Sequence, residues 1–320
     1  MDEHRVKLAI VIPAFKASYL ERTLSSVVSQ SDQRFALYIG DDASPEPIED
    51  VVRQFASTRP IVYQRFQQNV GRHSLTKHWQ RCIAMSSEPW IWLFSDDDLM
   101  EPECVSAFYR TLADTNGHYD VYRYDTIVID GLDRVQSLNP PHPQVESALH
   151  FAYFLLMDRR LSYVQEAIVS RAALERAGGF VEFPLAWSSD WATQILLGHD
   201  RGICKINGPL VRFRMSGVNI SSAFSRRIMK EKMKANMMFI SWLMQLVEGN
   251  DLKEDVIGIE QMRQESMRWF IRVTVNRDML YAPSDCIHIV RFAHRMWGLG
   301  RLHTLARVVK FNVHTLLDRL

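Results

Sequence analysis

Three consecutive aspartates, Asp96, Asp97 and Asp98, directly follow the apolar run Trp90–Phe94. Carboxylates packed together repel one another and raise each other's pKa unless a cation neutralises them. Magnesium takes oxygen ligands, typically one or two carboxylates together with substrate phosphates. The cluster therefore predicts a divalent metal site that could bridge a diphosphate and stabilise it as a leaving group. The alternative is a solvated helix N-terminus, where acidic side chains interact favourably with the helix dipole.

Two further acidic positions could take part in chemistry. Asp41 and Asp42 follow another apolar run, although a plain turn before Pro45 would account for them equally well. Asp190 is flanked by tryptophans and precedes a helical pattern. It is therefore either an N-cap residue or a partly desolvated carboxylate suited to general-base catalysis. Composition alone does not choose between these two roles.

The elements that would position these residues alternate along the first half of the chain. Apolar runs predict strands at 8–12, 35–39, 61–63 and 90–94, and helical spacings between them predict helices starting near Leu20, Ile48 and Leu75. Such alternation is typical of βαβ units and a mostly parallel sheet, so the fold class is α/β. Ligands of open parallel sheets bind beyond the carboxyl ends of the strands, which is where the acidic residues lie.

The pattern changes after Asp120. Strands are predicted at 121–124, 127–129 and 164–169, with one helix over 148–157 and another ending at Gly178. From about residue 225 the pattern is helical to the end. We therefore expect a catalytic domain over residues 1–223 and a C-terminal helical region over residues 224–320.

Composition excludes several classes of protein. The 320 residues are 47% hydrophobic and 23% charged, as in an ordinary globular enzyme, and the net charge of +1 gives no nucleic-acid footprint. The four cysteines are scattered without the spacing of a zinc site or disulfide framework. No apolar run approaches the roughly 18 residues of a membrane span, and the N-terminus lacks a signal peptide's anatomy. A cytoplasmic protein is expected.

Four short motifs, read in order, resemble the family 2 glycosyltransferases of GT-A fold. The family's V-I-P-x-Y/F opening, D-D-x-S turn, N-x-G segment and D-x-D metal motif correspond to Val11–Phe15, Asp41–Ser44, Asn69–Arg72 and Ser95–Asp98. The resemblance covers roughly residues 6–222. The ordered set is specific, although each motif alone is weak, and Ser95-Asp96-Asp97-Asp98 departs from the commoner D-x-D-D wording.

The resemblance implies a nucleotide-sugar site. Pro13, Ala14 and Phe15 would line the nucleobase pocket, with Asp41 beside it and Asp42 bonded to the base. The nucleotide would also be approached by Asn69, Gly71 and Arg72.

The resemblance implies further roles around the metal and the transferred sugar. Asp98, together with Asp96, would hold Mn²⁺ or Mg²⁺, while Asp96 and Asp97 would contact the donor; which carboxylate touches the metal stays open. Arg214 lies in the segment from Arg212 to Ser221 that would close over the diphosphate, and Asp190 would be the catalytic base.

The implied activity is inverting transfer of a single sugar from a nucleotide-diphosphate sugar, expected to be a UDP-sugar. The acceptor would be a hydroxyl of a glycan or lipid-linked glycan in surface polysaccharide synthesis. Processive synthases carry a Q-x-x-R-W signature that this chain lacks. The alternatives are a metal-dependent sugar nucleotidyltransferase and a non-catalytic nucleotide-sugar-binding protein. Pro13–Lys16 stands where nucleotidyltransferases carry a glycine-rich loop, which counts against the first.

The C-terminal third is basic and amphipathic. Residues 291–320 interleave Arg, His and Lys with apolar side chains, a pattern that can lie on an anionic membrane surface or cover the protein's own domain. The expected partners are therefore the donor, the glycan acceptor, the inner face of the plasma membrane through peripheral contact, and a second copy of the chain.

Overall fold

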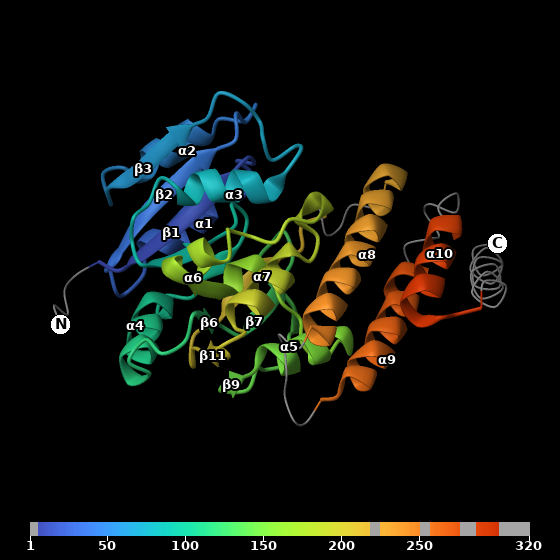
Figure 1. Ribbon diagram of the computed structural model, residues 1–320. Helices are drawn as coiled ribbons and strands as arrows, with labels where there is room; N and C mark the ends of the chain where they lie inside the picture. The colour runs from blue at the N-terminus through green and yellow to red at the C-terminus, as the bar shows by residue number, and fades with distance from the viewer. Residues whose placement is uncertain (1–5, 218–224, 250–256, 276–285, 301–320) are drawn as a thin grey trace.

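The structure is a computed structural model that describes residues 6–217, 225–249, 257–275 and 286–300. An eight-stranded sheet runs in the order β3-β2-β1-β4-β10-β6-β11-β9, with helices on both faces (Figure 1). Its strands are β1 (Leu8–Ala14), β2 (Phe35–Asp41), β3 (Ile61–Arg65), β4 (Trp90–Leu93), β6 (Val121–Arg123), β9 (Val145–Glu146), β10 (Ala167–Ser170) and β11 (Ile203–Lys205).

The first four strands pair in parallel, as the βαβ pattern predicts, so their four carboxyl ends meet at one edge. The register places Ala14 beside Asp41, and Val11 beside Leu93. Beyond β4 the sheet becomes mixed, because β10 is antiparallel to both β4 and β6. The α/β class expected from the sequence is confirmed, and the parallel half carries the predicted site.

A second sheet adjoins this edge in the order β5-β12-β7-β8. Its strands are β5 (Leu99–Met100), β7 (Thr126–Ile129), β8 (Val135–Leu138) and β12 (Val211–Arg214). Because β5 begins one residue after Asp98 and pairs with β12, the small sheet holds the acidic cluster in place from its C-terminal side.

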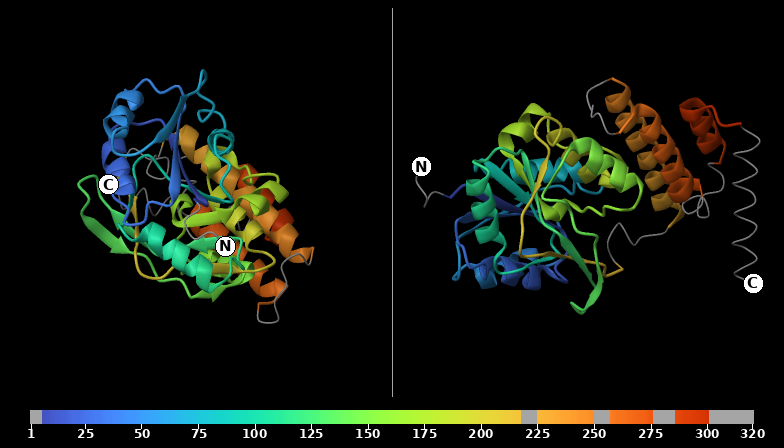
Figure 2. Two further views of the ribbon diagram at one scale, coloured as in Figure 1. Left: turned by 90° about the vertical axis from the view of Figure 1, so that its left-hand side faces the viewer. Right: turned by 90° about the horizontal axis from the view of Figure 1, so that it is seen from below.

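Alternation of side chains along β1 divides the core into two layers. Ala9 and Val11 pack on the side of α3 (Leu75–Ile83), together with α5 (Ala148–Leu156), α6 (Arg171–Arg176) and α7 (Ser189–Leu197). Leu8, Ile10 and Ile12 point to the other side, which is covered by α1 (Leu20–Val28), α2 (Ile48–Phe55) and α4 (Cys104–Asp114). The two-layered arrangement is clearest from below (Figure 2).

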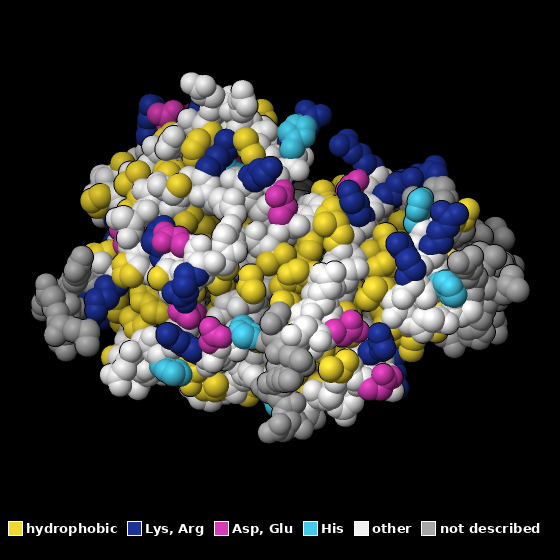
Figure 3. Space-filling model, in the orientation of Figure 1, with side chains coloured by type: hydrophobic (Ala, Val, Ile, Leu, Met, Phe, Trp, Pro, Cys, Tyr) yellow, Lys and Arg dark blue, Asp and Glu magenta, His cyan; other side chains and the backbone are white. Residues whose placement is uncertain are grey.

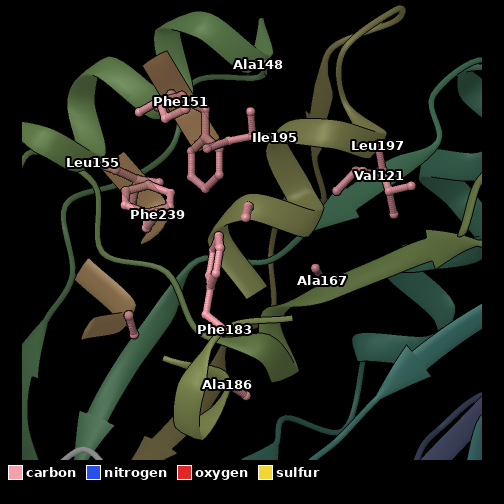
Figure 4. Close-up of a cluster of buried hydrophobic side chains, with 14 of the residues drawn as sticks. Val121, Ala148, Phe151, Leu155, Ala167, Phe183, Ala186, Ile195, Leu197 and Phe239 are labelled. Atoms are coloured by element: carbon pink, nitrogen blue, oxygen red, sulfur yellow. The ribbon is translucent and has the colours of Figure 1, made fainter. Parts of the chain in front are cut away.

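The C-terminal helices extend the first of these layers. They are α8 (Arg226–Glu248), α9 (Ile259–Phe270), which continues as one turn of π-helix over Ile271–Val275, and α10 (Cys286–Trp297). Phe239 of α8 packs among Phe151, Leu155 and Phe183 (Figure 4), so the helices share a core with the α/β part. Among the described residues no helix is both long and apolar enough to cross a bilayer.

One predicted strand is wrong in its first half. The strand expected over 164–169 begins only at Ala167, and Val164–Glu166 instead forms a short 3₁₀ helix, η1. The cause is Glu166, which is fully buried and accepts hydrogen bonds from Arg123 and from Oγ1 of Thr126, the latter at 2.9 Å. Satisfying this buried carboxylate turns the chain away from the extended conformation.

Candidate active site

The acidic cluster lies where β4 leaves the sheet, and it is tied to the loop after β1. Oδ2 of Asp96 accepts hydrogen bonds from the backbone N–H groups of Phe15 at 2.8 Å and Lys16 at 2.9 Å. Ser44 closes the other side of this loop by donating its hydroxyl to the Phe15 carbonyl at 2.5 Å. The ends of β1, β2 and β4 singled out in the sequence are therefore joined by hydrogen bonds at one edge of the sheet.

Asp98 is the most deeply buried of the three aspartates. Its Oδ1 accepts the backbone N–H of Arg214 at 2.7 Å, whereas its Oδ2 has no hydrogen-bond partner within the described part of the chain. Burial raises the pKa of Asp98 well above the usual carboxyl range, and the charge of Asp97 raises it further. A buried oxygen without a donor is costly when ionised unless a cation neutralises it.

Asp97 is buried as well, and desolvation together with the charge of Asp96 raises its pKa to about 7, against the opposing charges of Lys16 and Arg214. No group of three or more His, Cys, Asp or Glu side chains converges as a complete metal site among the residues described. Magnesium and manganese, however, take carboxylates together with donor phosphates. The raised pKa values and the orphan oxygen fit a cation whose remaining ligands come from the substrate.

Arg214 holds the acidic cluster in place through its backbone and side-chain N–H groups. Its side chain is fully buried, donates from Nε to the Asp97 carbonyl at 2.6 Å and forms an ion pair with Asp133. The guanidinium also lies 4.4 Å from the centre of the Tyr19 ring. The structure thus places this predicted nucleotide-sugar residue below the cluster, where it holds the backbone of Asp97. Residues 218–221 of the segment predicted to close over the diphosphate lie outside the described residues.

Asp41 and Asp42 are both buried and both fix the backbone of neighbouring loops. Asp41 accepts from the backbone N–H of Ser44 at 2.7 Å and, through Oδ2, from Tyr63 at 2.8 Å and Arg65 at 2.7 Å. Such a carboxylate is held by donors on several sides, more firmly than a plain turn residue requires.

The carboxylate of Asp42 reaches across to the predicted Asn69–Arg72 segment. Its two oxygens accept the backbone N–H groups of Val70 and Gly71, each at 2.8 Å, and Oδ1 also pairs with Arg81. Asn69 shapes the same loop, since its Oδ1 accepts the backbone N–H of Arg72 at 2.8 Å. Asp42 therefore joins the Asn69–Arg72 segment to the end of β2. Arg72, the last residue of that segment, is exposed.

Adding a methyl group at Gly71 should disturb this loop, because a Cβ there would overlap Oδ2 of Asp42. For Gly71→Ala we expect a loss of roughly 1–3 kcal/mol in the free energy of unfolding, from overpacking, together with weaker binding of nucleoside diphosphate. Urea unfolding and calorimetric titration measure the two effects. Gly258→Ala, where the nearest atom is 3.9 Å away, is the control. Unchanged nucleotide binding in Gly71→Ala would remove this loop from the donor site.

Asp190 lies in the first turn of α7 and is half-buried. The N-cap position itself is taken by Ser188, in the left-handed conformation with φ 65°, so Asp190 is not the cap. Burial raises the pKa of Asp190 to about 7 against the backbone N–H of Trp191, and the charge of Glu166 adds to the increase. A carboxylate with such a pKa can accept a proton near neutral pH, as a general base must.

Tyr163 connects the two acidic parts of the site. Burial raises the pKa of its hydroxyl to about 12, and the neighbouring charges of Glu166, Asp98 and Asp190 contribute. Its ring stacks on Phe213 of β12 with centroids 4.0 Å apart. The charges of both the acidic cluster and the candidate base therefore act on this tyrosine.

Several residues of this site were missed in the sequence. Arg65, Arg81, Tyr163 and Glu166 are held by partners more than 20 positions away, and no local motif marks them. The one available signal was the isolated charge: an Arg in a strand or a Glu in an apolar run requires a partner when buried.

The mixed α/β sheet, with acidic residues at the ends of two of its parallel strands and helices on both faces, is the fold of GT-A glycosyltransferases. The family model described as Glycosyl transferase family 2 matches residues 9–176. The chain therefore belongs to glycosyl transferase family 2. No curated protein matches the chain by sequence.

Solved structures share the fold over nearly the whole chain. S. aureus TarS residues 1–349 in complex with UDP-GlcNAc superposes with a TM-score of 0.68 at 12% identity, covering 96% of this chain and 89% of that one. The mannosyltransferase PcManGT from Pyrobaculum calidifontis, in complex with GDP-Man and Mn²⁺, gives a TM-score of 0.51 at 14% identity, with 97% and 81% covered. At these identities the likeness concerns the fold alone.

Proposed function

We propose that this glycosyltransferase moves a single sugar from a nucleotide-diphosphate sugar, with UDP as the expected nucleotide, to a hydroxyl of a glycan or lipid-linked glycan. The transfer inverts the anomeric centre and serves surface polysaccharide synthesis. The observation that carries the proposal is the meeting of Asp41, Asp42 and the Asp96–Asp98 cluster at the carboxyl ends of neighbouring parallel strands, where Asp96 bonds the loop after β1. That edge of the sheet would hold the leaving diphosphate, and Asp190 would activate the acceptor.

The donor nucleoside would occupy the crevice between two loops. The loop with Pro13, Ala14 and the exposed Phe15 would form one wall, and Asn69, Gly71 and Arg72 would form the other. Asp96 holds the first loop by accepting the backbone N–H groups of Phe15 and Lys16. Asp42 holds the second by accepting those of Val70 and Gly71. The bound UDP-GlcNAc of TarS and GDP-Man of the mannosyltransferase support a nucleotide-sugar donor in this fold.

A divalent cation, Mn²⁺ or Mg²⁺, would be held by Asp98 together with Asp96. Asp97 is the alternative ligand. The Mn²⁺ of the mannosyltransferase complex supports a metal in this fold. Bound there, the cation would neutralise the charge that develops on the leaving diphosphate. Arg214 keeps Asp98 and the Asp97 backbone in position through its own N–H groups.

Asp190 would deprotonate the acceptor hydroxyl, which then attacks the anomeric carbon as the C–O bond to the diphosphate breaks. Electrostatic stabilisation of that diphosphate should be the larger contribution to the rate. An ordinary aspartate, with a pKa near 4, is a weak base. The surroundings of Asp190 make it a stronger one. Burial and the nearby Glu166 bring its pKa to about 7.

The rate of transfer should depend on pH through Asp190. Its pKa is raised to about 7, and only the deprotonated form accepts a proton, so kcat should rise as pH increases through about 7 and level off above. Below about pH 6 we expect roughly a tenfold fall for each pH unit. The check is a pH–rate profile at saturating donor, with nucleotide binding followed across the same range. A flat profile between pH 5 and 8, with binding intact, would contradict the assignment.

A donor screen tests the proposal as a whole. UDP- and GDP-sugars are incubated with the enzyme and Mn²⁺, and released nucleoside diphosphate is measured with and without EDTA. Metal-dependent release of UDP from a UDP-sugar is expected. Release of pyrophosphate in place of nucleoside diphosphate would indicate a nucleotidyltransferase, and binding without any release would indicate a non-catalytic nucleotide-sugar-binding protein.

Peripheral contact with a membrane through the C-terminal helices is also part of the proposal. The structure describes only the first part of the predicted amphipathic segment, α10, and residues 301–320 lie outside the described residues. Co-sedimentation with anionic vesicles tests the contact.

A further inference from the structure

A groove of about 740 Å³ lies between α8 and α10, and no residue of the acidic cluster lines it. Its basic wall carries Lys234 from α8 with His288, Arg291 and Arg295 from α10. Figure 3 shows dark blue and cyan side chains gathering over these two helices. The size corresponds to that of small-molecule sites in proteins, so the groove is large enough for a ligand bigger than a simple ion.

Several cations of this groove have no acidic partner among the described residues. Lys234, Arg291 and Arg295 make no ion pair in the part of the chain that the structure describes, and Glu231 is the one acidic residue among the described lining. The whole chain carries a net charge of only +1, so this accumulation is local. Positive side chains along a concave surface concentrate the field and attract an anion.

The floor of the same groove is apolar. Met237 and Phe292 line it, and both also line a second hollow of about 470 Å³ that continues past Trp242 to Phe183. A simple phosphate ion would use the guanidinium groups but not this floor. A ligand that matches both halves has a phosphate at one end and a hydrocarbon chain at the other.

The apolar end of the groove lies beside the segment that carries the candidate base. The backbone N–H of Phe183 donates to Oγ of Ser189, the neighbour of Asp190, at 3.1 Å. Trp187 of the same segment donates its indole N–H to Oδ1 of Asn236 on α8 at 3.0 Å. A ligand in the groove would therefore contact elements, α8 and Phe183, that are hydrogen-bonded to the segment carrying Asp190.

We propose that the groove between α8 and α10 binds a lipid-borne phosphate, the anionic anchor of a lipid-linked acceptor. This inference rests on the proposed function. Of the two acceptors named there, a glycan and a lipid-linked glycan, it selects the lipid-linked one. Arg291 and Arg295 hold the phosphate, since guanidinium groups match its oxygens in pairs. Met237 and Phe292 contact the first part of the hydrocarbon chain.

Farnesyl phosphate, kept below its micellar concentration, is a suitable probe in calorimetric titration of the full chain without donor. We expect it to bind the wild type, and Arg291→Gln/Arg295→Gln to weaken binding by at least about tenfold, as the loss of two charge-assisted contacts implies. Arg53→Gln/Arg110→Gln removes the same charge from two exposed arginines on α2 and α4 and should leave binding unchanged. Met237→Ser should weaken binding of farnesyl phosphate without affecting inorganic phosphate.

Three results would overturn the proposal. Inorganic phosphate or a polyphosphate binding as tightly as farnesyl phosphate would mark a site for anions without a lipid. Farnesol binding equally well would remove the role of the charge, and equal losses in both double variants would show non-specific attraction. UDP binding is followed in every variant, so failure at the groove with UDP binding intact leaves the donor site standing. If the wild type itself does not bind UDP, the result would instead argue against the proposed function.

Discussion

Replacing Asp190 with asparagine should lower kcat by about 10²–10⁴-fold, the usual contribution of a general base. The amide keeps the shape of the side chain at the start of α7 but cannot accept the proton of the acceptor hydroxyl. Binding of the nucleotide should be nearly unchanged, because the donor loops are held by Asp41, Asp42 and Asp96. Acceptor-dependent release of nucleoside diphosphate, with calorimetric binding of UDP, measures both effects.

Asp114→Asn provides the matched control, since it makes the same change on an exposed residue of α4. Asp190→Glu, which retains a carboxylate one methylene further out, should restore part of the activity. Equal loss of nucleotide binding and of transfer in Asp190→Asn would instead assign the residue a structural role.

Asp98→Asn should lower activity without lowering stability. Loss of its charge weakens the metal site, and we expect transfer to fall by roughly 10²–10³-fold, in line with several kcal/mol of charge stabilisation. Without metal, the wild-type carboxylate is buried, and its Oδ2 has no donor among the described residues. The neutral amide removes that cost, so the free energy of unfolding in EDTA should be unchanged or higher.

Activity across a Mn²⁺ titration and urea unfolding in EDTA measure the two effects. Excess Mn²⁺ should recover part of the lost rate if Asp98 contributes metal affinity. A variant that loses stability in EDTA, with the same Mn²⁺ dependence as the wild type, would show that Asp98 acts only by holding the backbone of Arg214.

Much of the parallel half could be predicted because its signals are local. The apolar run at residues 8–12 and the helical spacing from Leu20 give β1 and α1 directly, and the acidic residues at strand ends follow from them. The family expected from the four ordered motifs is confirmed by the match over residues 9–176. Short-range periodicity suffices wherever an element is buried on one regular face.

The mixed half resisted prediction because its determinants are distant in the sequence. Glu166 bends η1 through partners about 40 positions away, which no local pattern contains. Arg214 carries the family's motif position, yet its guanidinium is engaged below the cluster by Asp133 and Tyr19. Whether a polar side chain faces the ligand or supports its neighbours depends on these long-range contacts, which only the folded chain brings together.

The position of the Asp96 carboxylate has a consequence for how the affinities of two ligands depend on each other. It holds the backbone of Phe15 and Lys16, in the loop proposed to contact the nucleobase, and it belongs to the cluster that would take the cation. In the proposed site, a shift of that carboxylate on cation binding would therefore move the loop of Phe15 and Lys16. Because coupling free energies are reciprocal, the factor by which the cation changes nucleotide affinity would equal the factor by which the nucleotide changes cation affinity. Metal and nucleotide would then be thermodynamically linked through one side chain.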